Sequence, residues 1–274
     1  MRILLVNDDG IACEGILEMA KALVIHHDVT VVAPMENRSY ISHSMAVKPG
    51  TTFRVARPAI PGLEKAAVFT VSGTPCDCVH IAMTQLLSQA PDLIISGINY
   101  GDNMGSELYP SGTFNSAIAG RLYGIPAISF SCLAMDMAGG FSLAASYANQ
   151  IIEAILSLDT IPDNVVFNVN YPRTLSIKGI RVSHQEKQRV SYSYHRVESI
   201  DGEDIYEFDH IHAPNDTAVS PWDRYNLING YITITPVTLY GTDEAMVETL
   251  TPLLNADYVE GSDVLGTGRN AADR

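Results

Sequence analysis

Two adjacent aspartates, Asp8 and Asp9, are the residues of this sequence best suited to chemistry. They follow the short apolar run Arg2–Val6. Neighbouring carboxylates repel each other and resist removal from water, so a positive group is expected between them. A hard divalent cation meets that need, because it prefers oxygen ligands. The competing interpretation is structural: Asp8 caps the next helix, and Asp9–Gly10 forms the turn.

Two further polar segments follow predicted strands. The segment Met35–Ala46 leaves the second strand at the same edge of the sheet as Asp8, so its side chains can reach that site. Ser39 lies in this segment, and taken alone it is an ordinary loop hydroxyl. The segment Ser96–Gly105 is rich in glycine and asparagine, which lets its backbone approach a ligand closely. Asn99 within it offers a neutral oxygen to a hard cation.

A third candidate is the tripeptide Ser111, Gly112 and Thr113, which precedes a predicted helix over Phe114–Tyr123. A helix entered in this way presents amides, the positive end of the helix dipole and two hydroxyls, which suit a phosphate. An N-cap role for Ser111 or Thr113 explains the same residues equally well. The segment is not a Walker loop, because no lysine stands at the required place.

The elements that would position these residues alternate between strand and helix. Runs that are apolar on both faces predict buried parallel strands with helices above and below, and therefore an α/β fold with one doubly wound sheet. The predicted strands are Arg2–Val6, Asp28–Pro34, Thr51–Arg57, Ala66–Ser72, Asp92–Ile95, Ile125–Ser131 and Asn164–Asn170. The predicted helices are Glu14–Ile25, Cys76–Ser88, Phe114–Tyr123 and Phe141–Leu158.

Beyond Lys178 the pattern changes, so we predict a core over 1–177 and an appended region over 178–274. That region is expected to hold an antiparallel hairpin around Asp201–Gly202, which would project from the core and serve oligomerisation or arm exchange. Its other predicted parts are a strand at Gly179–Val182, an irregular stretch at Asn215–Asn229, a strand at Tyr231–Pro236, a helix at Asp243–Leu254 and frayed residues from Gly261.

Composition limits the possible partners. The chain has 274 residues with 17 basic and 31 acidic side chains, a net charge of −14. Such a protein repels a nucleic-acid polymer, although a small phosphorylated ligand remains compatible if a metal and amides neutralise its charge. The four cysteines have no zinc-type spacing and are expected as free thiols. With no signal-peptide pattern and no run of membrane-spanning length, we expect a cytoplasmic protein with no membrane partner.

Several motifs occur together and in order, and their combination is far more specific than any one of them. They are Asn7–Gly10, Val32–Pro34 with Asn37–Ser39, Ser72–Val79, Ser96–Asn99 with Gly101 and Asn103, and Ser111–Thr113. Together they resemble the stationary-phase survival protein SurE family, metal-dependent phosphatases that act on nucleoside monophosphates. The resemblance is dense in the first half of the chain and thinner in the second, through Phe167–Asn170, Gly179–Val182 and Gly230–Pro236.

The resemblance implies a Rossmann-like core and a complete site. One divalent ion per subunit, Mg²⁺ or Mn²⁺, would be held by Asp8, Asp9, Ser39 and Asn99. Ser111, Gly112 and Thr113 would bind the phosphate, and Asn103 would join Asp8 and Asp9 as a catalytic group. The resemblance also implies a homodimer or homotetramer with an exchanged hairpin or C-terminal segment. Whether an aspartate or a water attacks phosphorus stays open, although water is favoured because both carboxylates are wanted as ligands.

The chain also departs from the family pattern. Tyr40 stands where a glycine is usual, Pro110 replaces an aromatic residue and Ala119 replaces a glutamate. None of these changes removes a metal ligand, but several are expected to crowd the pocket, so the substrate preference stays open. Two alternatives follow: a non-catalytic paralogue that senses a nucleotide or phosphate, and a metal-dependent deacetylase on a similar sheet. The second needs histidine ligands, and no suitably placed histidine follows Asp8 and Asp9.

Overall fold

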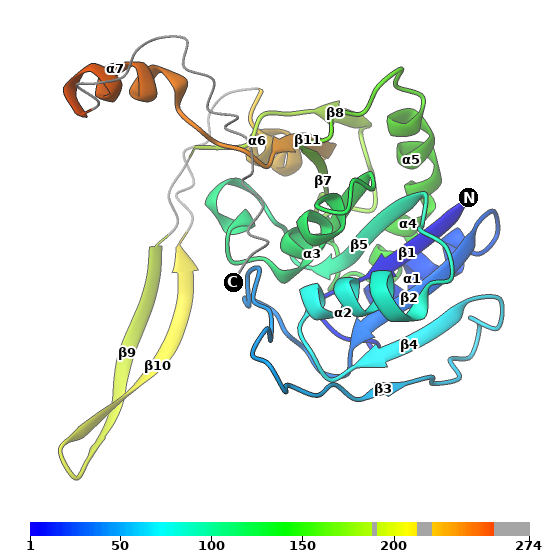
Figure 1. Ribbon diagram of the computed structural model, residues 1–274, viewed down its shortest axis with the longest axis horizontal. Helices are drawn as coiled ribbons and strands as arrows, with labels where there is room; N and C mark the ends of the chain where they lie inside the picture. The colour runs from blue at the N-terminus through cyan, green and yellow to red at the C-terminus, as the bar shows by residue number, and fades with distance from the viewer. Residues whose placement is uncertain (188–190, 213–220, 255–274) are drawn as a thin grey trace, which may run out of the picture. The chain divides into compact units, whose positions relative to one another are not determined.

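The computed structural model describes residues 1–187, 191–212 and 221–254. Within these residues a sheet of nine strands has the order β3-β4-β2-β1-β5-β6-β7-β11-β8 (Figure 1). Its strands are β1 (Arg2–Val6), β2 (Asp28–Pro34), β3 (Val55–Ala56), β4 (Ala67–Val71), β5 (Leu93–Tyr100), β6 (Ala127–Cys132), β7 (Val165–Tyr171), β8 (Ile180–Val182) and β11 (Ile232–Thr238). The helices of this part are α1 (Glu14–Leu23), α2 (Pro75–Ile81), α3 (Gly112–Arg121), α4 (Gly140–Ser146), α5 (Ala148–Leu156) and α6 (Asp223–Ile228).

Pairing in the sheet is mostly parallel. Strands β4, β2, β1, β5, β6 and β7 run parallel to one another. At the two ends, β3 is antiparallel to β4 and β11 is antiparallel to β7, while β8 runs parallel to β11. Strand β1 lies between β2 and β5, where the strand order reverses, and ligands of open α/β sheets bind beyond the carboxyl ends of the strands at such a point. The predicted doubly wound, mostly parallel sheet is confirmed.

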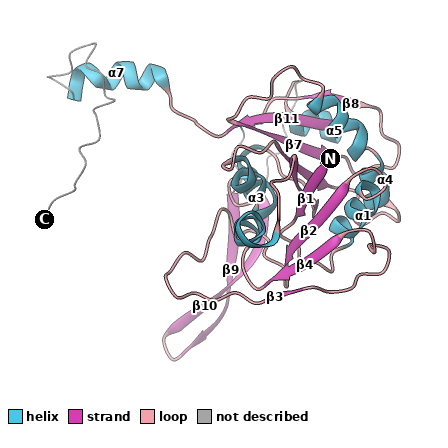
Figure 2. Cartoon of the chain, turned by 45° about the vertical axis from the view of Figure 1, so that its right-hand side comes forward, coloured by secondary structure: helices cyan, strands magenta, loops and turns pink. Residues whose placement is uncertain are grey.

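The two faces of β1 enter different apolar clusters. Ile3 and Leu5 pack with side chains of α1, α4 and α5, whereas Leu4 and Val6 pack with α2 and α3. Figure 2 shows α1, α4 and α5 grouped on one side of the sheet and α3 on the other. Burial on both faces explains why this strand is a continuous apolar run without alternation.

Several predicted boundaries differ from the structure. Strand β3 is much shorter than the predicted Thr51–Arg57, and the predicted helix Phe141–Leu158 is two helices separated at Tyr147, whose amide bonds the Ala144 carbonyl in a tight turn. Helix α2 continues as a π-turn, η1 (Ala82–Leu86), and stops before Ser88. Strand β5 extends to Tyr100 and follows β6 past a register shift, so half of the predicted loop is strand. The predicted irregular stretch contains α6 in its described part.

The predicted hairpin is present as β9 (Ser191–Ile200) and β10 (Glu203–His212). Asp201 and Gly202 both have positive φ, 51° and 84°, which is the conformation of a two-residue hairpin turn. Residues Met1–Leu239 belong to one unit, and a second begins at Tyr240, in which α7 (Glu244–Leu254) is described. The expectation for the residues from Gly261 lies outside the described chain. No helix in the described ranges is long and apolar enough to cross a bilayer.

Candidate metal and phosphate site

The site is assembled from the carboxyl edge of the sheet and the start of a helix. Asp8 and Asp9 follow β1, Ser39 follows β2, and Asn99 lies near the end of β5. Thr113, in the first turn of α3, hydrogen-bonds both Asp8 and Asn99. The structure thus brings together residues from segments that are distant in sequence, as the parallel topology predicts.

Asp8 is almost completely buried, with 2% of its surface exposed. Its Oδ2 accepts a hydrogen bond of 2.9 Å from the Thr113 amide, and its Oδ1 accepts one from the Thr113 hydroxyl. Burial and then the charge of Asp9 raise the pKa of Asp8 to about 7, although the Thr113 bonds work in the opposite direction. The carboxylate is therefore short of positive charge in its surroundings.

Asp9 connects two other segments. Its Oδ2 accepts a hydrogen bond of 2.9 Å from the Tyr100 amide, and its Oδ1 accepts a longer one, 3.3 Å, from the Ser39 hydroxyl. Burial raises the pKa of Asp9, and these hydrogen bonds lower it. The Ser39 hydroxyl thus lies beside a carboxylate. The position of Ser39 in a polar loop does not by itself indicate this contact.

Asn99 is held from both ends of its amide. Its Oδ1 accepts a hydrogen bond of 3.3 Å from the Thr113 hydroxyl, and its Nδ2 donates to the Gly101 carbonyl at 3.2 Å. This orientation places the amide oxygen on the side of Asp8, because the same Thr113 hydroxyl also contacts that carboxylate. An amide oxygen beside two carboxylates is a suitable donor set for a hard cation.

The start of α3 approaches Asp8 so closely that only glycine fits at position 112. A Cβ on Gly112 would lie 2.7 Å from both Cβ and Oδ2 of Asp8. Ser111 is the N-cap, and its Oγ accepts a hydrogen bond of 3.0 Å from the Phe114 amide. The capping interpretation of Ser111 is confirmed, whereas the phosphate-binding role of the tripeptide stays a prediction.

Asn103 is fixed by polar side chains of β6 and β7. Its side-chain Nδ2 donates to Ser131 Oγ at 2.9 Å, and its backbone N–H donates to Asn170 Oδ1 at 2.8 Å. Its backbone carbonyl accepts hydrogen bonds from the Nδ2 atoms of Asn168 and Asn170, at 2.8 and 2.9 Å. Asn168 and Asn170 were not predicted as site residues. The sequence feature that could have indicated them is a pair of asparagines, two positions apart, in a strand that is otherwise apolar.

A hollow of about 110 Å³ opens in front of these groups. Five residues that the sequence singled out line it: Asp8, Ser39, Asn99, Asn103 and Ser111. Its remaining walls include Tyr40, Tyr100, Asp102 and Glu107. Of these, only Tyr40 stands out in the sequence, as a departure from the family pattern. Ala119 does not line the hollow but is fully buried in the core under α3.

The acidic wall of the hollow is supported by Arg224 from α6. The guanidinium bonds Glu107 at 3.0 Å and Glu186 at 2.8 Å, and lies 3.9 Å from Asp102. Burial and then Asp102 raise the pKa of Glu107 to about 7, although Arg224 lowers it. Arg224 and Glu107 are 117 positions apart, so no local pattern could have predicted this pairing.

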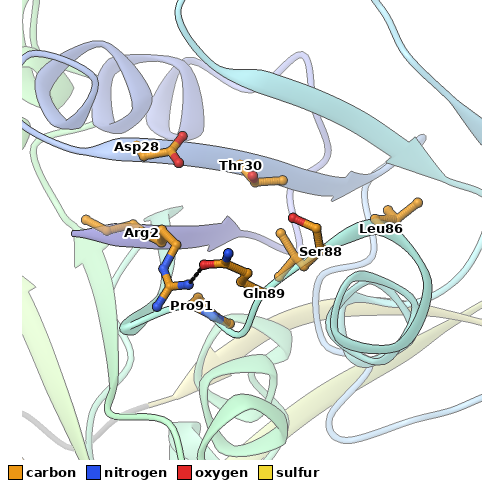
Figure 3. A pocket seen from close by; sticks show the side chains of 9 residues that line it. Arg2, Asp28, Thr30, Leu86, Ser88, Gln89 and Pro91 are labelled. Carbon is orange, nitrogen blue, oxygen red and sulfur yellow. Dashed lines mark hydrogen bonds between the residues drawn. The ribbon is translucent and has the colours of Figure 1, made fainter.

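A second hollow, of about 300 Å³, lies at the opposite edge of the sheet, where β1 and β2 begin (Figure 3). Its one arginine, Arg2, is bonded to Gln89 and, at 2.8 Å, to Asp92. The charge of Arg2 is therefore balanced within the protein. The chemistry-bearing groups gather at the carboxyl edge.

The donor atoms at the carboxyl edge suit a hard cation. They are two carboxylates, one hydroxyl and one amide oxygen, with no sulfur or imidazole among them, and this favours Mg²⁺ or Mn²⁺ over softer ions. Groups of three or more His, Cys, Asp or Glu side chains able to hold a metal are absent from the described residues. A metal site in this part of the chain would therefore have to include neutral oxygens.

The fold and site define a Rossmann-like α/β protein with an oxygen-lined acidic site facing a helix start. The family described as Survival protein SurE matches residues 3–192. The 5′-nucleotidase SurE of Aeromonas hydrophila is 35% identical over 241 residues, which cover 87% of this chain and 92% of that protein. That of Clostridium beijerinckii is 35% identical over 260 residues, covering 92% and 99%.

A solved structure gives the same result. The crystal structure of the SurE protein from Aquifex aeolicus superposes with a TM-score of 0.76 at 32% identity, covering 92% of this chain and 99% of that one. The chain belongs to the SurE family. The resemblance drawn from the ordered motifs is thereby confirmed.

Proposed function

We propose that this protein hydrolyses nucleoside monophosphates to nucleoside and inorganic phosphate in a reaction that depends on a divalent metal. Membership of the SurE family supports the reaction class, since the relatives are named 5′-nucleotidases. The observation that carries the proposal is the pair of poorly compensated carboxylates, Asp8 and Asp9, of which Asp8 is bonded to the start of α3. The deacetylase alternative is not favoured by these relatives.

The residues fit a divalent ion. Neither Asp8 nor Asp9 forms an ion pair with a Lys, Arg or His side chain within residues 1–187, 191–212 and 221–254. Asp8, Asp9, Ser39 and Asn99 would hold the ion, which supplies Lewis acidity toward a phosphoryl oxygen and a water. Four protein oxygens leave room in the coordination sphere of Mg²⁺ or Mn²⁺ for both.

The phosphate would be held by the start of α3. Ser111 lines the hollow, and the Gly112 amide lies in the first turn, where the helix dipole favours an anion. Thr113 works differently from its neighbours, because its amide and hydroxyl are both engaged by Asp8. Thr113 is thus a positioning residue for the carboxylate.

Asn103 would donate to the substrate from its fixed position. An amide nitrogen carries two protons, and the bond to Ser131 uses one of them. Asp8 and Asp9 are committed as ligands, so a water is the favoured attacking group. We extend the proposal to one ion per subunit, a homodimer or homotetramer formed by exchange of the hairpin or the C-terminal segment, and a cytoplasmic location.

The test is a panel of nucleoside monophosphates and a generic phosphate ester, assayed with Mn²⁺, Mg²⁺, Zn²⁺ or a chelator. We expect release of inorganic phosphate with Mn²⁺ or Mg²⁺ and none with the chelator. Release that survives chelation contradicts the metal site. Tight nucleotide binding without turnover under every metal identifies a nucleotide sensor instead.

A further inference from the structure

Two exposed tyrosines line the same hollow as the carboxylates. Tyr40 is 64% exposed and Tyr100 is 57% exposed, and both contribute to the wall of the hollow. Single exposed aromatic residues are common on protein surfaces, but two of them in the wall of one hollow are typical of a ligand site. Their place beside the proposed phosphate site indicates a ligand with an apolar, flat part.

Each of the two tyrosines directly follows a proposed metal ligand in the sequence. Tyr40 directly follows Ser39, and Tyr100 directly follows Asn99. The Tyr100 amide also donates to Asp9 Oδ2 at 2.9 Å. Because successive Cα atoms are about 3.8 Å apart, each tyrosine starts one residue from a side chain that would hold the metal ion. A ligand held at the metal therefore has an aromatic wall within reach.

The backbone holds Tyr40 in a conformation that a tyrosine rarely adopts. Its φ is +58°, in the left-handed region. The chain is fixed on both sides of it, by the Ser39 amide bonded to Asn37 at 2.8 Å and by the Ser42 amide bonded to the Pro110 carbonyl at 2.9 Å. Such outliers persist only where the surrounding structure imposes them, and they concentrate at ligand sites.

Tyr100 has support on one side only. Its ring centroid lies 6.4 Å from that of Phe141 at an angle of 45°. Phe141 itself is buried in the core, with 3% of its surface exposed. The contact steadies the ring, while more than half of the Tyr100 surface stays open to the solvent side. A ring held in this way is suited to stacking on a flat ligand.

The charge of the hollow decides which flat ligand fits. Asp102 and Glu107 line it, and with Glu186 they place three carboxylates around the single guanidinium of Arg224. A second phosphate would be repelled here, whereas an uncharged group with hydroxyl or amino donors would be accepted. A nucleoside satisfies both conditions, because its base is flat and its sugar carries hydroxyls.

We infer that Tyr40 and Tyr100 bind the base of a nucleoside monophosphate and thereby determine the preference for nucleotides over other phosphate esters. This inference rests on the proposed hydrolase function of the same site. Stacking of a base on an aromatic side chain tolerates every base, so the two tyrosines favour nucleotides as a class.

The experiment compares adenosine 5′-monophosphate with ribose 5-phosphate, which keeps the phosphate and sugar but lacks the base. We expect Tyr40→Leu and Tyr100→Ala each to lower kcat/KM for the nucleotide about tenfold, mainly through KM, and to leave ribose 5-phosphate unchanged. Tyr40→Phe and Tyr100→Phe keep the ring and should keep the preference. Tyr109→Ala is the matched control, because Tyr109 is 73% exposed close to the site but does not line the hollow.

Equal losses for both substrates, or no loss for either, overturn the inference while the hydrolase function stands. Calorimetric binding of adenosine 5′-monophosphate separates the two ideas if no ester is hydrolysed. Binding by the wild type that weakens about tenfold in Tyr40→Leu and Tyr100→Ala then supports the tyrosine platform and rejects the hydrolase. Absence of nucleotide binding by the wild type overturns the inference as well.

Discussion

Thr113 holds both carboxylate oxygens of Asp8. Its amide donates to Oδ2 at 2.9 Å and its hydroxyl donates to Oδ1, so one residue of α3 fixes the carboxylate that follows β1, 105 positions earlier in the chain. Both bonds lower the pKa of Asp8 and so favour the ionised form that a cation needs. Thr113 therefore acts on the proposed metal site through Asp8.

Replacing Thr113 by valine removes the hydroxyl and keeps the shape and the amide. We expect Thr113→Val to weaken Mn²⁺ binding about tenfold, because hydrogen bonds to charged groups contribute about 1.5–3 kcal/mol. Thr113→Ser keeps the hydroxyl and serves as the control. Titration calorimetry with Mn²⁺ measures the change, and equal affinity in wild type and Thr113→Val would contradict the assigned role.

Gly112 is expected to tolerate no side chain. A Cβ there would lie 2.7 Å from Asp8, so Gly112→Ala must push α3 away from the carboxylate or rotate Asp8. Overpacking of this kind costs about 1–3 kcal/mol of stability. A displacement near 1 Å costs about 10²-fold in rate. Gly241→Ala is the control, because a Cβ at Gly241 meets nothing within 4 Å. Full phosphatase activity in Gly112→Ala is the contrary outcome.

Asp8 gives the metal-free protein a pH-dependent stability. Burial, followed by the charge of Asp9, raises the pKa of Asp8 to about 7, whereas the unfolded chain has a value of about 4. Between these values the folded state keeps a proton that the unfolded state has released. The Asp8 contribution to the free energy of unfolding therefore falls as pH rises from about 4 to about 7, and it is level above and below that range.

Asp8→Asn cannot ionise and should remove this fall. Urea unfolding of the metal-free proteins near pH 4 and near pH 7 measures the free energy of unfolding at both ends of the range. Relative to the wild type, Asp8→Asn should gain stability as pH rises. The Mn²⁺ affinity of the wild type should in turn strengthen about tenfold per pH unit below 7 and level off above it, because the ion displaces the Asp8 proton. A wild-type to variant difference that does not change with pH contradicts the raised pKa.

Arg224 is expected to stabilise the acidic wall of the hollow. Its side chain is 14% exposed and bonds Glu186 and Glu107, so Arg224→Met leaves mostly buried carboxylates without a cation. We expect a loss of about 3 kcal/mol in the free energy of unfolding. Arg173→Met is the matched control, because its pairing with Asp136 is exposed and such pairs contribute little. Chemical denaturation decides between the two cases, and similar losses for both variants count against the argument.

The hairpin is expected to be covered by another copy of the chain. Tyr194 and Phe208 pack at 5.5 Å between ring centroids, yet 62% and 48% of their surfaces are exposed. A hairpin with so little burial is marginal by itself in water. We expect the double variant Tyr194→Glu, Phe208→Glu to lower the assembly mass measured by light scattering, while Glu203→Gln leaves it unchanged. An unchanged mass in the double variant contradicts arm exchange.

Much of the fold was predictable because β1 and its neighbours are apolar on both faces. The predicted strands Arg2–Val6 and Asp28–Pro34 agree with the structure to the residue, since buried apolar side chains dominate both. Helix boundaries were less predictable. The break at Tyr147 and the π-turn after Ile81 interrupt apolar patterns that read as continuous helices.

The site was predictable as an edge of the sheet and not as a set of contacts. Strand ends placed Asp8, Ser39 and Asn99 at one edge, because parallel strands deliver their last residues there. The bond from Thr113 to Asp8 and the cluster around Arg224 join residues more than a hundred positions apart. Contacts of that range depend on how α3 and α6 pack, which no local sequence pattern encodes.

The central claim is that Asp8 and Asp9 hold a divalent ion that the hydrolysis of nucleoside monophosphates requires. The most direct measurement is the initial rate of phosphate release from adenosine 5′-monophosphate by wild type and Asp9→Asn, with Mn²⁺ and with a chelator. We predict a metal-dependent rate in the wild type and a loss of roughly 10²-fold or more in Asp9→Asn. A wild-type rate that is the same in chelator, or an Asp9→Asn rate equal to that of the wild type, would contradict the claim.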